Sequence, residues 1–174
     1  MFRRANPFHR IVFLVAALLG WRAPALRAQA AGPGPWTVTA GFTGLRTGAT
    51  AGWVYGPELG IRRDFGPRWG VELRAALPVL DTEAYTDDGA AAIDLGPTLT
   101  FRTDKTELGA SAGITGFLVG DGGELIDGGI GAFAAGHATA WFSRHVGAVA
   151  GVNVRIAGSG AAYPSLSAGL AVRF

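Results

Sequence analysis

The sequence predicts an all-β fold: an eight-stranded antiparallel up-and-down transmembrane β-barrel that follows a removable N-terminal signal peptide. Three observations lead to this prediction. Apolar residues recur at every second position in eight segments, the links between the segments alternate in length, and the chain ends in "LSAGLAVRF" with strict apolar alternation up to Phe174. Alternation with a period of two indicates a strand with one apolar face, and an even number of strands returns both ends of a barrel to one side.

The first thirty residues have the features of a secretory signal peptide. Residues 1–10 hold three arginines and no acid, residues 11–20 are the apolar run IVFLVAALLG, and Ala28-Gln29-Ala30 is a small-x-small cleavage signal. Ten apolar residues are too few for a spanning helix, which needs about 20. We therefore expect residues 1–30 to be a signal peptide cleaved after Ala30, and residues 31–174 to form one outer-membrane β-barrel domain.

Removal of the signal peptide reverses the sign of the net charge. The full chain is +2, but residues 1–30 carry five of its fifteen basic residues and none of its thirteen acids, which leaves residues 31–174 at −3. This balance argues against a nucleic-acid partner. The chain has no cysteine, so it has neither disulfides nor thiolate chemistry. We expect no cofactor, no metal ion and no catalytic residue.

The eight strands are expected in segments that each have one apolar face. They are residues 36–42, 59–65, 69–79, 91–101, 108–118, 130–142, 146–156 and 166–174. Tight turns are expected at 66–68, 103–105 and 143–145, and longer links at 47–53, 81–89, 120–127 and 158–162. Short periplasmic turns opposite longer surface loops are typical of outer-membrane barrels. Pro97 falls inside the fourth strand, where a missing N–H predicts a bulge or a locally missing ladder bond.

Aromatic residues mark one end of the predicted strands. The second, fourth, sixth and eighth strands end their apolar faces on Phe, and the first and third begin theirs on Trp, which places all six rings at the short-turn rim, pointing outward. They are Trp36, Phe65, Trp69, Phe101, Phe142 and Phe174, and they form a candidate aromatic girdle at a membrane–water interface. Arg63 shares the outward face two residues from Phe65, where its side chain can extend to the interface.

The opposite face of the strands is suited to a narrow lumen. It is mostly Gly, Ser and Thr, with almost no Lys, whereas the exterior of a soluble secreted barrel, the alternative we considered, is normally rich in Lys and Glu. It also carries five acids and five arginines, and charges in a narrow lumen must pair. The predicted structural ion-pair network that plugs the lumen consists of Glu58, Arg62, Asp64, Glu72, Arg74, Asp94, Arg102, Glu107, Arg155 and Arg173.

The stretch "LSAGLAVRF" resembles the C-terminal signature of bacterial outer-membrane β-barrels, a terminal Phe preceded by apolar residues at alternate positions. Residues 31–174 as a whole resemble the small eight-stranded OmpA- and OmpX-type barrels. This resemblance implies a location in the cell outer membrane, with outer-membrane lipid and lipopolysaccharide as partners. It also implies that the barrel-insertion machinery reads the C-terminal strand, and that the role is structural or one of surface interaction rather than enzymatic.

Two alternative functions remain open. One is a narrow channel for small solutes, which requires the lumen ion pairs to open. The less favoured one is a lipid A-modifying enzyme, because His137-Ala138-Thr139 resembles the His-x-Ser pair of the eight-stranded lipid A deacylases, with Thr in place of Ser. We interpret His137 instead as a lumen side chain bonded to an acid. The surface ligand stays open.

The predicted long links are acidic, and the short-turn side is basic. Candidate residues for binding surface cations or a ligand are Asp81, Glu83, Asp87, Asp88, Asp121, Glu124 and Asp127, which with Arg46 give that side a net charge of −6. They could bridge divalent ions to lipopolysaccharide phosphates, or simply be solvated. The turn side carries Arg63, Arg68, Lys105 and Arg144 against Asp104, a net charge of +3. Four aromatic residues near the outer rim are expected to be interface anchors: Tyr55, Tyr85, Phe117 and Tyr163.

Overall fold

A closed antiparallel β-barrel is the whole of the described structure. The computed structural model describes residues 36–46, 53–77, 80–81, 89–121 and 124–174, all within one compact unit, 31–174. The predicted signal peptide lies outside the described residues. Among those that are described, no helix is long and apolar enough to cross a membrane.

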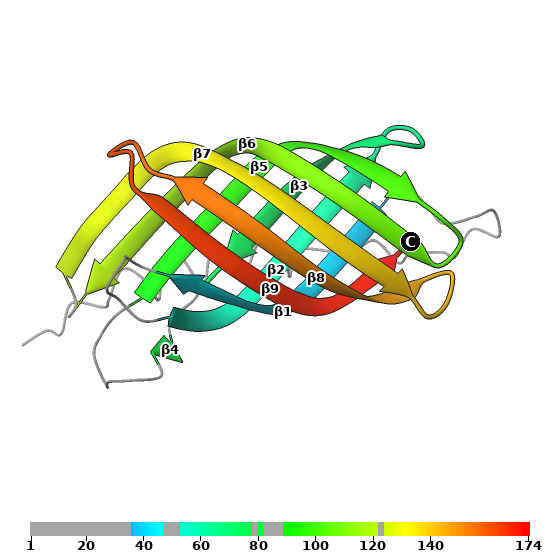
Figure 1. Ribbon diagram of the computed structural model, residues 1–174, viewed down its shortest axis with the longest axis horizontal. Coiled ribbons are helices and arrows are strands. Elements are labelled where there is room, and N and C mark those ends of the chain that lie inside the picture. Colours follow the sequence, from blue (N-terminus) through cyan, green and yellow to red (C-terminus); the bar gives the residue numbers. More distant parts are fainter. Residues whose placement is uncertain (1–35, 47–52, 78–79, 82–88, 122–123) are drawn as a thin grey trace, which may run out of the picture. The chain divides into compact units, whose positions relative to one another are not determined.

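Eight long strands and one two-residue strand make up the sheet (Figure 1). They are β1 (Trp36–Arg46), β2 (Trp53–Asp64), β3 (Trp69–Ala76), β4 (Leu80–Asp81), β5 (Gly89–Arg102), β6 (Thr106–Asp121), β7 (Glu124–Trp141), β8 (Val146–Ile156) and β9 (Ala162–Arg173). Each long strand pairs antiparallel with the next, and β1 pairs with both β2 and β9, which closes the barrel. The predicted eight-stranded up-and-down barrel is confirmed.

The third predicted strand, 69–79, is interrupted. β3 ends at Ala76, and β4 continues the pairing with β2 from Leu80. Glu58 lies opposite Ala76 whereas Val54 lies opposite Asp81, so the register shifts by one residue between the two pairings. The sequence between β3 and β4 contains Pro78, which has no N–H to donate to a ladder.

The three predicted tight turns are confirmed, because only three or four residues separate β2 from β3, β5 from β6 and β7 from β8. The predicted long link at 120–127 is wrong. β6 extends to Asp121 and β7 begins at Glu124, and the two residues face each other after a register shift at Val119/Gly120. Glycine-rich composition indicated a loop here, but a glycine backbone pairs in a ladder when a neighbouring strand is available. Asp121, Glu124 and Asp127 therefore belong to strands.

Pro97 interrupts the pairing of its strand on one side only. β5 pairs with β6 up to Leu95 opposite Ile114 and again from Thr98 opposite Ser111, in the same register but without pairs at the two residues between. On the other side Pro97 stays opposite Val71 of β3. The expected local loss of ladder bonding is confirmed, without a bulge.

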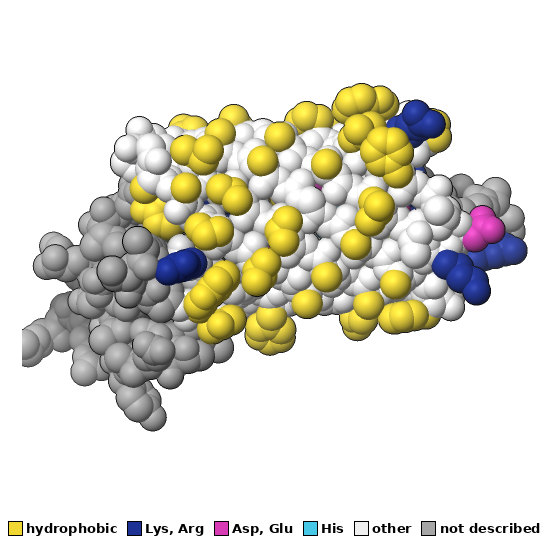
Figure 2. Space-filling view, in the orientation of Figure 1, with side chains coloured by type: hydrophobic (Ala, Val, Ile, Leu, Met, Phe, Trp, Pro, Cys, Tyr) yellow, Lys and Arg dark blue, Asp and Glu magenta, His cyan; other side chains and the backbone are white. Residues whose placement is uncertain are grey.

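The barrel has an apolar outside and a polar inside. Along β3, Trp69, Val71 and Leu73 are exposed, whereas the alternate residues Glu72 and Arg74 are buried. Figure 2 shows hydrophobic side chains over the side wall of the described barrel, with basic side chains at its ends. Since successive side chains of a strand point to opposite faces, the alternation places the ten charged residues that were predicted for the lumen on the inner face.

Candidate functional site in the barrel lumen

The largest group of ion pairs lies toward the short-turn end of the lumen and centres on Glu107. Its carboxylate lies 2.6 Å from Arg62, 2.7 Å from Arg102 and 2.5 Å from Arg173. Asp64 pairs with two of the same arginines, Arg62 at 3.1 Å and Arg102 at 2.6 Å. The Glu107 side chain is only 1% exposed. This group, the Glu107 cluster, holds three arginines and two acids, a formal charge of +1.

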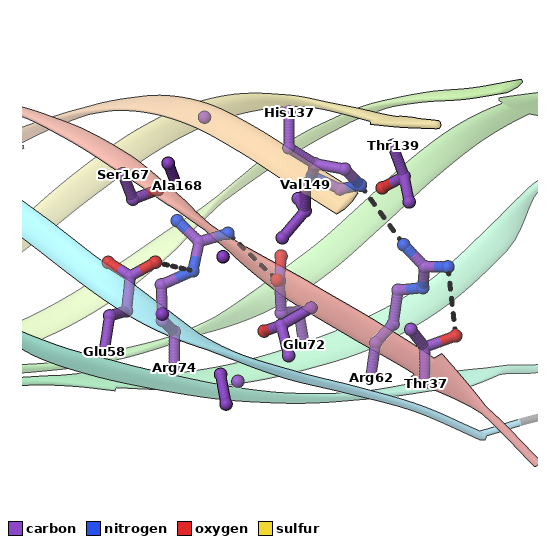
Figure 3. A pocket seen from close by; sticks show the side chains of 16 residues that line it. Thr37, Glu58, Arg62, Glu72, Arg74, His137, Thr139, Val149, Ser167 and Ala168 are labelled. Carbon is purple, nitrogen blue, oxygen red and sulfur yellow. Dashed lines mark hydrogen bonds and ion pairs between the residues drawn. The ribbon is translucent and has the colours of Figure 1, made fainter. Parts of the chain in front are cut away.

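A second group carries the opposite excess charge (Figure 3). Arg74 lies 2.9 Å from Glu72 and 3.8 Å from Glu58, so two acids share one arginine in this group, the Arg74 group. Residues of both groups line a small cavity of about 30 Å³, which is room for about two water molecules. Among the described residues, three buried atoms of the lining side chains have no hydrogen-bond partner: Arg62 Nε, Glu72 Oε2 and His137 Nδ1. Arg62 Nε is in an ion pair with Asp64 at 3.1 Å, and ordered water in the cavity would satisfy the other two atoms.

The third group is a single pair on the long-loop side, with hydrogen bonds to its neighbours. Arg155 donates from Nε and NH2 to the two carboxylate oxygens of Asp94, at 3.0 and 2.7 Å. Asp94 also accepts hydrogen bonds from Thr115 at 2.6 Å and Asn153 at 2.9 Å, while Arg155 donates to Ser165 at 3.2 Å. A two-point pair supported by further hydrogen bonds is the arrangement in which a buried ion pair is best tolerated.

An apolar cluster fills the long-loop end of the lumen. Its members are Leu45, Val54, Ala76, Ala90, Ala92, Phe117, Ala157 and Tyr163. The rings of Phe117 and Tyr163 lie 5.1 Å apart, and both side chains are buried. Their predicted role as outer-rim anchors is therefore wrong, because both fall on the inward-pointing alternation of their strands. Tyr55 is exposed as predicted, and Tyr85 lies outside the described residues.

Trp141 is an inward residue that the sequence analysis missed. It is buried at the end of β7, where the Arg173 guanidinium lies 4.0 Å from its ring centroid. Phe133, on the same strand, is also buried inside the barrel. Both stand at the alternate positions of β7 that point into the barrel. The sequence already shows two large apolar residues at these otherwise polar or small positions, and this could have identified them.

The six predicted girdle residues lie together on the outside of the short-turn rim. All are exposed, from 38% for Trp36 to 72% for Phe142, and all stand at strand ends on the side of the tight turns. Arg63 points outward among them. Its guanidinium carbon lies 5.2 Å from the Trp36 ring centroid and 5.3 Å from that of Phe65.

His137 is part of the ion-pair network. Its Nε2 lies 3.2 Å from Arg62 NH1 and 3.7 Å from a carboxylate oxygen of Glu107. Thr139 is buried on the same inner face. The pair thus lies inside the barrel and not on the wall that the exposed apolar residues form.

The acidic candidates for a surface cation or ligand site cannot be placed as a site. Glu83, Asp87 and Asp88 lie outside the described residues, and Asp81, Asp121, Glu124 and Asp127 are placed only by the backbone pairing of their strands. Among the described residues, no group of three or more potential metal ligands occurs.

Comparison with known proteins shows the fold and leaves the family open. No family model matches the chain, and no curated protein matches its sequence. Neisserial surface protein A superposes with a TM-score of 0.62 at 18% identity, covering 83% of this chain and 100% of that one. Ail, the attachment invasion locus protein of Yersinia pestis, solved with the heparin analogue sucrose octasulfate, gives 0.57 at 13% identity, covering 80% and 97%. The N-terminal β-barrel domain of Pseudomonas aeruginosa OprF gives 0.56 at 14% identity, covering 82% and 99%.

This is the fold of the small eight-stranded outer-membrane barrels. The OmpA- and OmpX-type transmembrane barrel predicted from the sequence is thereby confirmed as the architecture. Identities below one fifth carry no residue roles from these proteins to this chain, so any function must be argued from the lumen and the outer surface.

Proposed function

We propose that the protein spans the bacterial outer membrane as a plugged, non-enzymatic barrel with a structural or surface-interaction role. The observation that carries the proposal is the combination of an apolar exterior with a filled, charge-balanced lumen. The short turns, the start of β1 at Trp36 and the end of β9 at Arg173 then face the periplasm. The longer links face the cell surface.

The outer wall supports a membrane location. Large apolar side chains are exposed all around the barrel, among them Phe42, Leu73, Ile114 and Ile130, the last at 79%. In water, each Å² of this exposed apolar area would cost about 25 cal/mol of free energy. Soluble monomers rarely expose apolar patches beyond a few hundred Å², whereas hydrocarbon is the natural environment of this wall.

The lumen supports a plugged rather than a conducting barrel. Along its length it contains the Glu107 cluster, the Arg74 group, the Asp94–Arg155 pair and the apolar cluster at the long-loop end. The excess charge of +1 in the first group is offset by −1 in the second. A channel for small solutes would have to separate these buried ion pairs. Each pair that is broken would cost several kcal/mol.

The surroundings of His137 support a non-enzymatic role. Its Nε2 faces Arg62 and Glu107, and no described hydroxyl group is hydrogen-bonded to either ring nitrogen as a nucleophile would be. A lipid-modifying site must also reach the membrane leaflet, whereas this side chain is enclosed by the barrel wall.

The partners follow from the location. Outer-membrane lipid surrounds the apolar wall, lipopolysaccharide is the expected neighbour of the long-loop side, and the barrel-insertion machinery is the expected reader of β9, the strand that closes the barrel on β1. No surface ligand is assigned.

Conductance and fractionation test the proposal together. The full chain, expressed in a Gram-negative host and purified from membranes in detergent, should fractionate with the outer membrane and show the heat-sensitive gel mobility of a folded barrel. Inserted into a planar bilayer, it should give no discrete conductance. Reproducible steps from verified folded protein would replace the plugged barrel by the narrow channel, and recovery in the detergent-free aqueous fraction would exclude the membrane location.

A further inference from the structure

Two arginines lie against exposed aromatic rings on the outward rim from β1 to β5. Arg63 is a charged residue among apolar side chains at the short-turn rim, and within the described chain it has no ion pair with an acid. The neighbouring acid Asp64 points inward and is held by Arg62 and Arg102. The Arg63 guanidinium instead lies against the two rings of Trp36 and Phe65.

A second arginine of the same β2–β3 hairpin also lies over an outward ring. The guanidinium carbon of Arg68, in the turn between β2 and β3, lies 5.8 Å from the ring centroid of Phe101 on β5. Arg68 is exposed, and so is Phe101. Figure 2 shows basic side chains beside exposed hydrophobic ones at the short-turn end of the barrel.

We propose that Arg63 and Arg68, with the rings of Trp36, Phe65 and Phe101, form a binding site for the headgroup of an anionic phospholipid in the leaflet at the short-turn rim. The guanidinium carbons lie over the rings, as in cation–π contacts, and the guanidinium N–H groups are the donors that would bind phosphate oxygens. Arginine donates two parallel hydrogen bonds to a phosphate, which gives it a geometry that lysine lacks.

The charge of the rim favours a net-anionic headgroup over a zwitterionic one. Arg63, Arg68, Lys105 and Arg144 stand against a single rim acid, Asp104. Basic residues near an anionic membrane surface attract it, and those that also contact the headgroup add hydrogen bonds to the phosphate. The site rests on the proposed membrane location, but it depends on neither the plugged lumen nor the acidic links.

Native mass spectrometry of the detergent-solubilised full chain tests this site. The protein is mixed with phosphatidylglycerol or with phosphatidylcholine, and the fraction that retains one lipid is measured. We expect preferential retention of phosphatidylglycerol, and a roughly fivefold loss of it in Arg63→Gln, the factor that corresponds to one lost hydrogen bond to the phosphate. Arg68→Gln should lose a similar amount.

The matched control is Arg144→Gln, which removes one positive charge from the same rim but touches no ring in the described structure. It should change retention less than twofold, and Arg63→Lys should fall between Arg63→Gln and the wild type. Equal retention of both lipids, or an equal loss in Arg144→Gln and Arg63→Gln, would overturn the proposed site. Heat-sensitive gel mobility verifies that each variant is folded, and the conductance result remains a separate test of the plugged barrel.

Discussion

Glu107 is the residue on which the largest number of lumen ion pairs depends, and Glu107→Gln tests that dependence. The substitution keeps the size of the side chain and removes its charge. Arg62 and Arg102 keep Asp64 as a partner, at 3.1 and 2.6 Å. Arg173 has no second acid partner among the described residues, and keeps only the contact of its guanidinium with the Trp141 ring.

The expected loss follows from how many charges are left unpaired. Breaking a buried ion pair by removing one partner costs about 3–5 kcal/mol. Only one of the three arginines loses its last acid, and the Arg102 side chain is 25% exposed to solvent, so we expect a value near the lower limit, about 3 kcal/mol of unfolding free energy.

Urea unfolding of the full chain in phospholipid vesicles, followed by tryptophan fluorescence, measures the effect. Glu58→Gln is the control, because Glu58 lies 3.8 Å from Arg74, which keeps Glu72 at 2.9 Å. No arginine loses its last acid partner in this variant, so we expect a clearly smaller loss than in Glu107→Gln. A Glu107→Gln variant within about 1 kcal/mol of the wild type, or a Glu58→Gln variant that loses as much as Glu107→Gln, would refute the assignment of Glu107 as the centre of the network.

Two further predictions concern packing inside the barrel, and both are measured by the same unfolding assay. A Cβ on Gly109 would meet the ring of His137, so Gly109→Ala should displace that ring and cost about 1–3 kcal/mol. Gly116→Ala on the same strand meets no atom within 4 Å and should stay within about 0.5 kcal/mol of the wild type; equal losses at the two glycines would contradict the close packing on His137. Phe117→Ala should open a cavity in the apolar cluster and cost about 3–5 kcal/mol, whereas Phe117→Leu should cost less than about 1.5 kcal/mol. A Phe117→Ala variant as stable as the wild type would mean that this end of the lumen is not packed.

The faces of the strands could be read from the sequence because the side-chain period of a strand is fixed at two. Once Leu170 and Phe174 were placed outward, Arg173 and Ala171 had to point inward, and the same rule placed all ten lumen charges on one face. The same rule also applied to Phe117 and Tyr163, whose alternation pointed inward although their position near a rim suggested an anchoring role. Alternation was the better guide, because a covalent geometry enforces it, whereas rim position is only a tendency.

The sequence by itself determined the all-β class, the two faces of each strand, the three tight turns and the set of charges that share the lumen. The tertiary structure alone decided which charges meet. Asp94 lies opposite Arg74 in the β3–β5 ladder, yet its carboxylate binds Arg155 of β8 across the lumen, and Glu107 of β6 reaches Arg62 of β2. The physical reason is that closure of the barrel brings together side chains from strands that are not neighbours, and the separation between them depends on the curvature of the whole sheet rather than on any local pattern.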